Sequence, residues 1–215
     1  MNRVVLSFLA VFALATKLFA GGWAIITLND FPDYAVAGKP INLTLAVRQH
    51  GRTLLGGLRP TIRATTAGGL IKATAKVTSA APRGEYSAAL VLPQQGDWTI
   101  TITSGFNDNS ITLPTLKVIA PETPEPAPFS PATRGVRLFA AKGCVGCHRH
   151  VEVNPGRGTE LGPDLTGKRF PQDYLKQFLA DPGIKPVEMP NLNLKPDEIE
   201  ALAAFINKSF TKQAR

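Results

Sequence analysis

The stretch that decides the fold of the C-terminal part is Cys144-Val145-Gly146-Cys147-His148, two thiols at Cys-x-x-Cys spacing with a histidine directly after them. The chain has no other cysteine. This spacing is the attachment pattern of c-type haem. Each thiol can form a thioether with one vinyl group of the haem, and the histidine can bind iron from one face. The pattern therefore predicts one covalently bound haem c, held by Cys144, Cys147 and His148.

Two other interpretations of the same cysteines are a redox dithiol and half of a zinc site. A thioredoxin-type dithiol lies beside a βαβ pattern, which the flanking sequence lacks. A structural zinc site needs four Cys or His ligands. The two histidines near the cysteines, His148 and His150, are too close together for zinc-finger spacing, and His150 is expected to be a surface residue. Haem c is the interpretation that the downstream sequence also supports.

Met189 is the candidate for the second axial ligand of the iron. It is the only methionine besides Met1, and it lies in Val187-Glu188-Met189-Pro190. A lone methionine is more often core filler, but this one follows a haem motif and precedes a helical pattern. A thioether opposite a histidine raises the reduction potential of haem iron. We therefore predict that His148 and Met189 bind the iron from its two faces.

Two further patterns lie downstream of the haem motif. The run Leu161-Gly162-Pro163-Asp164-Leu165 is rich in turn residues. In residues 195–206, Pro196 suits a first helical turn, and the acidic residues after it suit the positive end of the helix dipole. Apolar residues then recur at helical spacing, at Ile199, Leu202, Phe205 and Ile206.

Taken together, these patterns make residues 131–213 resemble a class I mono-haem cytochrome c. In that family, the helix that leads into the haem motif crosses the last helix closely at a glycine, the position that Gly135 occupies. The resemblance also implies that the carbonyl of Pro163 accepts a hydrogen bond from the ligand histidine, and such a partner fixes the orientation of the ring. Residues 171–179 match the middle helix. The resemblance predicts an all-α cytochrome c fold for residues 132–215.

Residues 1–20 have the features of a secretory signal peptide. Arg3 supplies the positive charge, residues 4–15 are mostly apolar, and Ala20-Gly21 is a plausible cleavage point. The apolar run is shorter than the ~20 residues of a membrane span, and Lys17 interrupts it. If it stayed uncleaved, the N-terminus would associate the protein with a membrane. We expect export to the periplasm or another extracytoplasmic compartment.

Residues 21–120 have a different pattern, with short β-rich segments separated by turn residues. Apolar and polar residues alternate clearly in residues 42–48 and 98–103. About seven strands in about 100 residues is the scale of an immunoglobulin-like sandwich. The expected strands are Ala24–Leu28, Ile41–Arg48, Thr61–Thr65, Ile71–Thr78, Tyr86–Leu92, Trp98–Ser104 and Ile111–Val118. The chain is thus predicted to have two domains, an all-β immunoglobulin-like sandwich followed by an all-α cytochrome c fold.

Part of the predicted sandwich also resembles a known family. Arg48-Gln49-His50-Gly51, and Gly84-Glu85-Tyr86 leading to Gly96-Asp97-Trp98, resemble the YtkA-like family of small extracytoplasmic sandwiches. Some members of that family accompany respiratory or copper-handling systems. Soft-metal sites need several His, Met or Cys ligands, and this module offers only His50. We therefore expect His50 to be a turn or strand-end residue.

The two domains are joined by residues 121–131, which contain five prolines. Such a segment predicts an extended, semi-rigid spacer up to roughly 30 Å long, and the two modules are expected to be independent. The chain carries a formal charge of +8, but the basic residues are spread along it, so nucleic-acid binding is not expected. Lys142, Lys168 and Arg169 are candidates for steering an acidic redox partner.

These observations predict an extracytoplasmic electron-transfer protein that meets redox partner proteins, with the sandwich as a docking or tethering module. We do not expect an enzyme, because a Met189 ligand would close the sixth position of the iron. Two alternatives stay open. One is a fixed cytochrome c subunit of a respiratory complex, and the other is a haem sensor or enzyme whose sixth ligand can be displaced.

Overall fold

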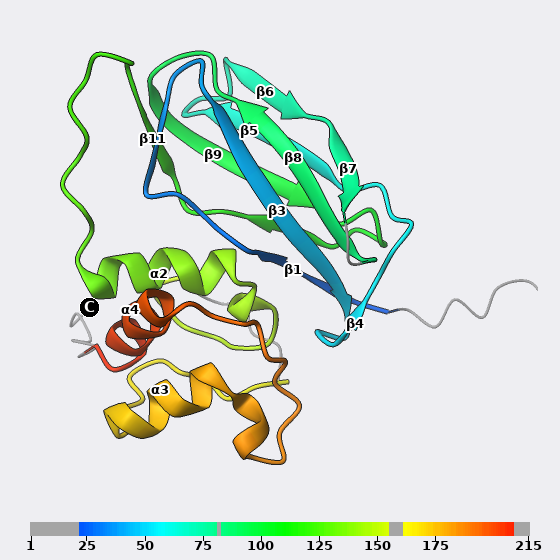
Figure 1. Cartoon of the computed structure of the whole chain (residues 1–215), viewed down its shortest axis with the longest axis vertical. Coiled ribbons are helices and arrows are strands. Elements are labelled where there is room, and N and C mark those ends of the chain that lie inside the picture. Colours follow the sequence, from blue (N-terminus) through cyan, green and yellow to red (C-terminus); the bar gives the residue numbers. More distant parts are fainter. Residues whose placement is uncertain (1–21, 81–82, 155–160, 209–215) are drawn as a thin grey trace, which may run out of the picture.

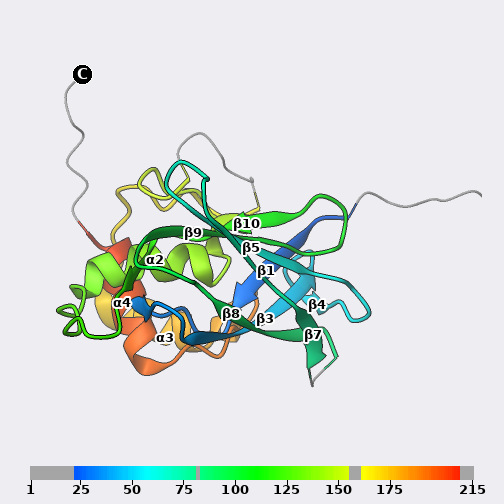
Figure 2. The ribbon, with the colours of Figure 1, turned by 90° about the horizontal axis from the view of Figure 1, so that it is seen from above.

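The computed structural model describes residues 22–80, 83–154 and 161–208. A β-sandwich of two sheets lies above three α-helices, and the predicted two-domain layout is confirmed (Figure 1). Seen from above, the sandwich extends beyond the helices on the side of β4 and β7 (Figure 2). The expected signal peptide, residues 1–20, falls outside the described residues. Among the helices of the described residues, none has the length and apolarity to span a membrane.

The first sheet has the order β1-β3-β8-β7, and β4 pairs with β3 beside this path. Every pairing in this sheet is antiparallel. Its strands are β1 (Ala24–Leu28), β3 (Pro40–Gln49), β4 (Thr53–Leu54), β7 (Val77–Ala80) and β8 (Glu85–Val91).

The second sheet has the order β2-β11-β9-β5-β6, and β10 pairs with β9 beside this path. Its strands are β2 (Tyr34–Val36), β5 (Thr61–Thr66), β6 (Lys72–Ala75), β9 (Gly96–Thr103), β10 (Ser110–Thr112) and β11 (Leu116–Ile119). The alternation in β9 turns Trp98, Ile100 and Ile102 into the core, where each is fully buried. The indole nitrogen of Trp98 donates to the carbonyl of Gln94 at 3.0 Å, so this buried polar atom is satisfied.

Two of the predicted strands are wrong, because the structure has two strands in place of each. The segment expected over residues 71–78 is two strands, β6 and β7, which belong to different sheets. The segment expected over residues 111–118 is β10 and β11, with Pro114 between them, where proline cannot donate a ladder hydrogen bond. The short strands β2 and β4 were not expected, because two or three residues are too few to show alternation.

The second domain contains α2 (Pro131–Ala141), α3 (Gln172–Ala180) and α4 (Pro196–Ile206), with short 3₁₀ turns at Cys144–Gly146 (η1) and Pro182–Ile184 (η2). Helix α2 begins at the last residue of the predicted spacer, because proline suits a first helical turn. The side chain of Ser130 caps this helix by accepting a hydrogen bond from the backbone N–H of Thr133 at 3.3 Å.

Helices α2 and α4 cross closely at Gly135, as the sequence predicted. A Cβ at this position would overlap the carbonyl oxygen of Ala201 and would approach Phe205. The rings of Phe139 and Phe205 meet edge to face with centroids 5.5 Å apart. Only a residue without a side chain allows this crossing, and the crossing buries both phenylalanines.

The sandwich and the helices share a buried interface, so the expectation of independent modules held apart by the spacer is wrong. Arg137 of α2 is 8% exposed. It donates to the carbonyl of Thr115 at 2.6 Å and to that of Pro32 at 3.2 Å, and it lies over the ring of Phe31. Ala141, at the end of the same helix, belongs to the apolar core of the sandwich.

A buried ion pair completes this interface. Lys142 Nζ lies 2.7 Å from Glu198 Oε1, and the two residues are 4% and 2% exposed. Lys142 also donates to the carbonyl of Asn29 in the sandwich at 2.6 Å. Glu198 accepts in addition from the backbone N–H of Lys195 at 3.0 Å, which caps α4. Lys142 is therefore not available to steer a redox partner.

Substitution of Gly135 by alanine should lower the free energy of unfolding by about 3 kcal/mol or more, because a backbone oxygen cannot move aside for the new methyl group. Urea unfolding of the holoprotein, followed by circular dichroism, measures the change. Gln177→Ala, at an exposed position of α3, is the control and should stay within about 0.5 kcal/mol of the parent. Equal stability of the two variants would contradict the close crossing.

The change Glu198→Gln should cost about 3–5 kcal/mol, because it leaves the buried ammonium of Lys142 without a counter-charge. The same substitution at Glu200, whose pair with Lys176 on the surface has an N–O distance of 2.6 Å, should cost under about 1 kcal/mol. Both variants lie on one helix and differ in burial. A loss of the same size in both would show that the Lys142–Glu198 pair is not buried in solution.

Candidate functional site

The two cysteines lie on a tight turn directly after helix α2. Gly143 has a φ of 75°, a left-handed conformation that glycine adopts without strain. The 3₁₀ turn η1 follows, and the backbone N–H of His148 bonds to the carbonyl of Cys144 at 2.8 Å. No disulfide joins the two thiols. Burial raises the pKa of the Cys144 thiol to about 12 and also raises that of Cys147, whereas a redox dithiol needs a lowered thiol pKa.

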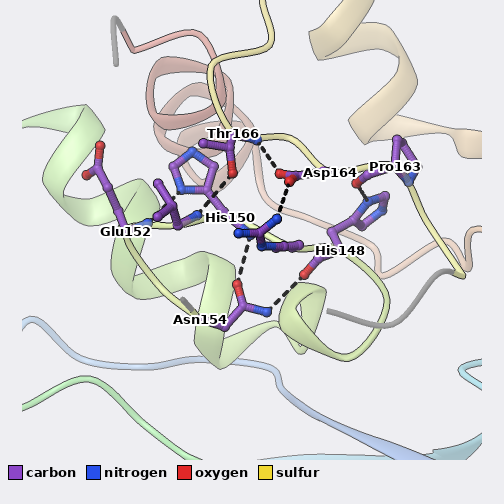
Figure 3. Close-up of polar contacts among 9 residues, drawn as sticks. His148, His150, Glu152, Asn154, Pro163, Asp164 and Thr166 are labelled. Atoms are coloured by element: carbon purple, nitrogen blue, oxygen red, sulfur yellow. Dashed lines mark hydrogen bonds and ion pairs between the residues drawn. The ribbon is translucent and has the colours of Figure 1, made fainter. Parts of the chain in front are cut away.

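The imidazole of His148 lies beside the carbonyl of Pro163, the partner that the resemblance to a class I cytochrome c implies. Its Nδ1 lies 3.0 Å from the carbonyl oxygen of Pro163 (Figure 3). A carbonyl can only accept, so Nδ1 carries the proton and Nε2 keeps a lone pair that can bind a metal. A Cβ at Gly162 would lie 2.6 Å from the ring. Glycine at this position therefore lets the loop approach the imidazole.

Backbone hydrogen bonds hold the two segments of this site together. The N–H of Gly162 donates to the carbonyl of Cys147, and the N–H of Leu165 donates to that of Arg149, both at 3.0 Å. Asn154 adds a side-chain link (Figure 3): its amide donates to the carbonyl of His148 at 3.2 Å and accepts from the N–H of His150 at 2.8 Å. Sequence reasoning missed Asn154, because a single asparagine in a polar loop has no distinguishing pattern.

His150 is buried, which corrects the expectation of a surface residue. It is 3% exposed and its ring lies 4.3 Å from that of Phe205 and 6.0 Å from that of Phe139. Its Nδ1 accepts from the backbone N–H of Glu152 at 3.3 Å, and burial lowers its pKa. The ring is therefore neutral and part of the core. Its spacing of two residues from His148 places it on the other side of the chain, toward helices α2 and α4.

Met189 lies on the loop between η2 and α4. It is half-buried and packs against the apolar core of the helical domain, as Cys144 also does. Three large apolar side chains, on the loop before Pro163, at the end of η2 and on the methionine loop, remain exposed: Leu161 at 57%, Ile184 at 47% and Val187 at 48%. The attachment turn and the methionine loop thus meet at one apolar cluster.

These residues fit a covalently attached haem. No disulfide joins Cys144 and Cys147, and their spacing suits two thioethers to one haem. The tautomer of His148 leaves Nε2 for the iron, and the neighbouring exposed apolar side chains suit a flat apolar macrocycle. The residues that could hold haem c are Cys144, Cys147, His148 and Met189, with Pro163 beside the histidine.

His50 occupies the turn between β3 and β4, in line with its expected place. Its φ is 51°, and its backbone N–H donates to the carbonyl of Trp23 at 3.0 Å. The imidazole lies 5.6 Å from the indole ring of Trp23.

Comparison with known proteins bears on the helical domain. Residues 130–206 match the family described as cytochrome C oxidase, cbb3-type, subunit III. This match covers less than half of the chain. It shows that the C-terminal part is a cytochrome c domain, and such a domain implies covalently bound haem c. Among the curated proteins, none matches the chain.

Three of the solved structures that resemble this chain do so at low identity and over less than half of its length. Domains 1–6 of the surface layer protein SbsC have 15% identity and a TM-score of 0.36, over 48% of this chain and 14% of that one. Domains 4 and 5 of SbsC have 15% identity and a TM-score of 0.34, over 46% of this chain and 54% of that one. The Lin-41 filamin domain has 14% identity and a TM-score of 0.32, over 45% of this chain and 91% of that one. The YtkA-like resemblance of residues 21–120 stays a prediction.

Replacement of Gly162 by alanine should displace the loop from the imidazole and weaken the hydrogen bond to Pro163, at a cost of about 1–3 kcal/mol. Haem content and urea unfolding of the purified protein measure the effect. Gly183→Ala is a matched control in the same domain, since the atoms nearest to a Cβ there belong to the side chain of Asp181, at 3.0 Å or more. If the Gly162→Ala variant has the same haem content and stability as this control, the loop does not need to lie so close to the imidazole of His148.

Proposed function

We propose that the protein is an extracytoplasmic one-electron carrier with a single covalent haem c. The observation that carries the proposal is the hydrogen bond from Nδ1 of His148 to the carbonyl of Pro163, on an attachment motif within a cytochrome c domain. It fixes the tautomer that an iron ligand needs. Haem iron, when bound, supplies the change between the ferrous and ferric states.

Each residue of the site has a distinct role in this proposal. Cys144 and Cys147 attach the porphyrin, and His148 and Met189 are the axial ligands. Pro163 orients the imidazole and increases its basicity. A methionine opposite a histidine raises the reduction potential and fills the sixth position, which favours electron transfer over catalysis at the iron.

The remaining parts of the proposal concern location and partners. Residues 1–20 act as a signal peptide for export to the periplasm, and an uncleaved N-terminus would associate the protein with a membrane. The partners are redox proteins, and nucleic acid is not among them. The sandwich serves as a docking or tethering module, with immunoglobulin-like or YtkA-like character. Lys168 and Arg169, both exposed, remain candidates for contact with an acidic partner.

A second candidate function is that of a fixed cytochrome c subunit in a respiratory complex. The family that matches residues 130–206 is described as an oxidase subunit, which favours this alternative. Purification from native membranes separates the two. Recovery of the protein in a stable complex with larger subunits supports a fixed relay, and recovery as a separate protein supports a mobile carrier.

The visible spectrum of the oxidised holoprotein tests the ligand set. We expect the weak far-red band of an iron–thioether bond, and its loss in Met189→Ala, because alanine offers no sulfur. Carbon monoxide should bind the ferrous parent slowly and the variant readily. Gln177→Ala is the control and should match the parent. A parent without the band, or a variant with an unchanged spectrum, would exclude Met189 as a ligand and would favour the haem sensor or enzyme.

A further inference from the structure

One end of the sandwich lies against the haem-attachment turn. Ile25 of β1 is the contact residue, and it is 7% exposed. A Cβ at Gly146 would lie 2.9 Å from Cδ1 of Ile25, and one at Gly143 would lie 2.5 Å from its Cγ2. Both glycines of the turn therefore lie in contact with this side chain, which lines the turn from outside the helical domain.

The β3–β4 turn of the sandwich contacts the same region from beside Ile25. A Cβ at Gly51 would lie 3.3 Å from Cδ1 of Ile25, 3.7 Å from the Trp23 ring and 4.0 Å from Sγ of Cys147. The thiol of Cys147 that a thioether would use thus lies beside the sandwich. Val145 packs against the apolar cores of both domains.

The next residue of this turn contacts the methionine loop. Arg52 forms an ion pair with Glu188, which directly precedes Met189. From Lys185 to Lys195, a stretch that the structure describes completely, the loop has no helix or strand. The ion pair with Arg52 is therefore one of the contacts that place this loop, beside the hydrogen bond of Asn191 to the carbonyl of Ala180.

We propose that the sandwich forms part of the haem site, with Ile25 and Gly51 supporting the attachment turn and Arg52 acting as a positioning residue that holds the methionine loop closed through Glu188. This inference rests on the proposed ligation by Met189. The sandwich then supports the haem site of its own chain, in addition to any role in docking. The loop is closed when Met189 can reach the iron and open when it cannot.

The size of the expected effect follows from the exposure of the pair. Arg52 and Glu188 have side chains that are 51% and 86% exposed, and exposed pairs contribute little to global stability. Opening of one loop is a local equilibrium with a small free-energy gap. A pair of this strength should change the open population by about two- to fivefold, while the fold is unaffected.

Charge exchange tests this role. The variants Arg52→Glu and Glu188→Arg each place like charges together, and the double variant restores an ion pair with reversed polarity. Carbon monoxide binding to the ferrous holoprotein reports opening of the methionine loop, and carbon monoxide is neutral, so the charge changes do not steer it. We expect each single variant to bind carbon monoxide about two to five times faster than the parent, and the double variant to return to the parent rate.

The matched control is another ion pair between the domains, Lys195 with Asp30, whose side chains are 56% and 64% exposed. Asp30→Lys should leave the carbon monoxide rate unchanged, because this pair lies at the start of α4 and not beside Met189. Equal rates in the parent and both single variants would overturn the inference, as would single-variant effects that the double variant does not reverse. Met189→Ala, measured in parallel, shows separately whether the proposed ligation itself holds.

Discussion

The buried pair of Lys142 and Glu198 is the contact on which the arrangement of the whole molecule depends. Charges so fully removed from water are stable only when every polar atom has a partner. Here the ammonium also bonds to Asn29 of the sandwich, and the carboxylate also caps α4. The end of α2, the start of α4 and one edge of the sandwich therefore meet at one point, and none of them can move without leaving a buried charge unpaired.

This meeting point explains why the haem-attachment turn lies between the two domains. The turn begins directly after Lys142, so whatever fixes Lys142 also fixes the start of the motif. The close crossing at Gly135 sets the direction of α2, and the ion pair sets where it ends. Around His148, hydrogen bonds from Gly162, Leu165 and Asn154 hold the chain at Cys147, Arg149 and His148 itself. The histidine is thus held from both directions along the chain.

The contacts between the sandwich and the haem domain bear on electron transfer, and the sequence of the sandwich alone does not indicate them. Ile25 and Gly51 lie against the side of the turn that carries Cys147, and Arg52 reaches the methionine loop. A partner protein that approaches the haem from this side would meet the sandwich first. In the proposed carrier, the sandwich therefore helps to decide which face of the haem domain is available to a partner.

The sequence alone determined the chemistry and most of the elements, because those depend on short-range patterns. The Cys-x-x-Cys-His motif and the helix and β-strand periodicities are local signals, and the glycine of the helix crossing followed from the resemblance that the motif supports. Only the tertiary structure decided that His150 is buried between aromatic rings, that the expected strand over residues 71–78 divides between two sheets, and that the domains pack together. Such outcomes depend on residues that are distant in the chain. In the sequence, nothing distinguishes Lys142 from a surface lysine, and its burial follows from its contacts with Glu198 and Asn29.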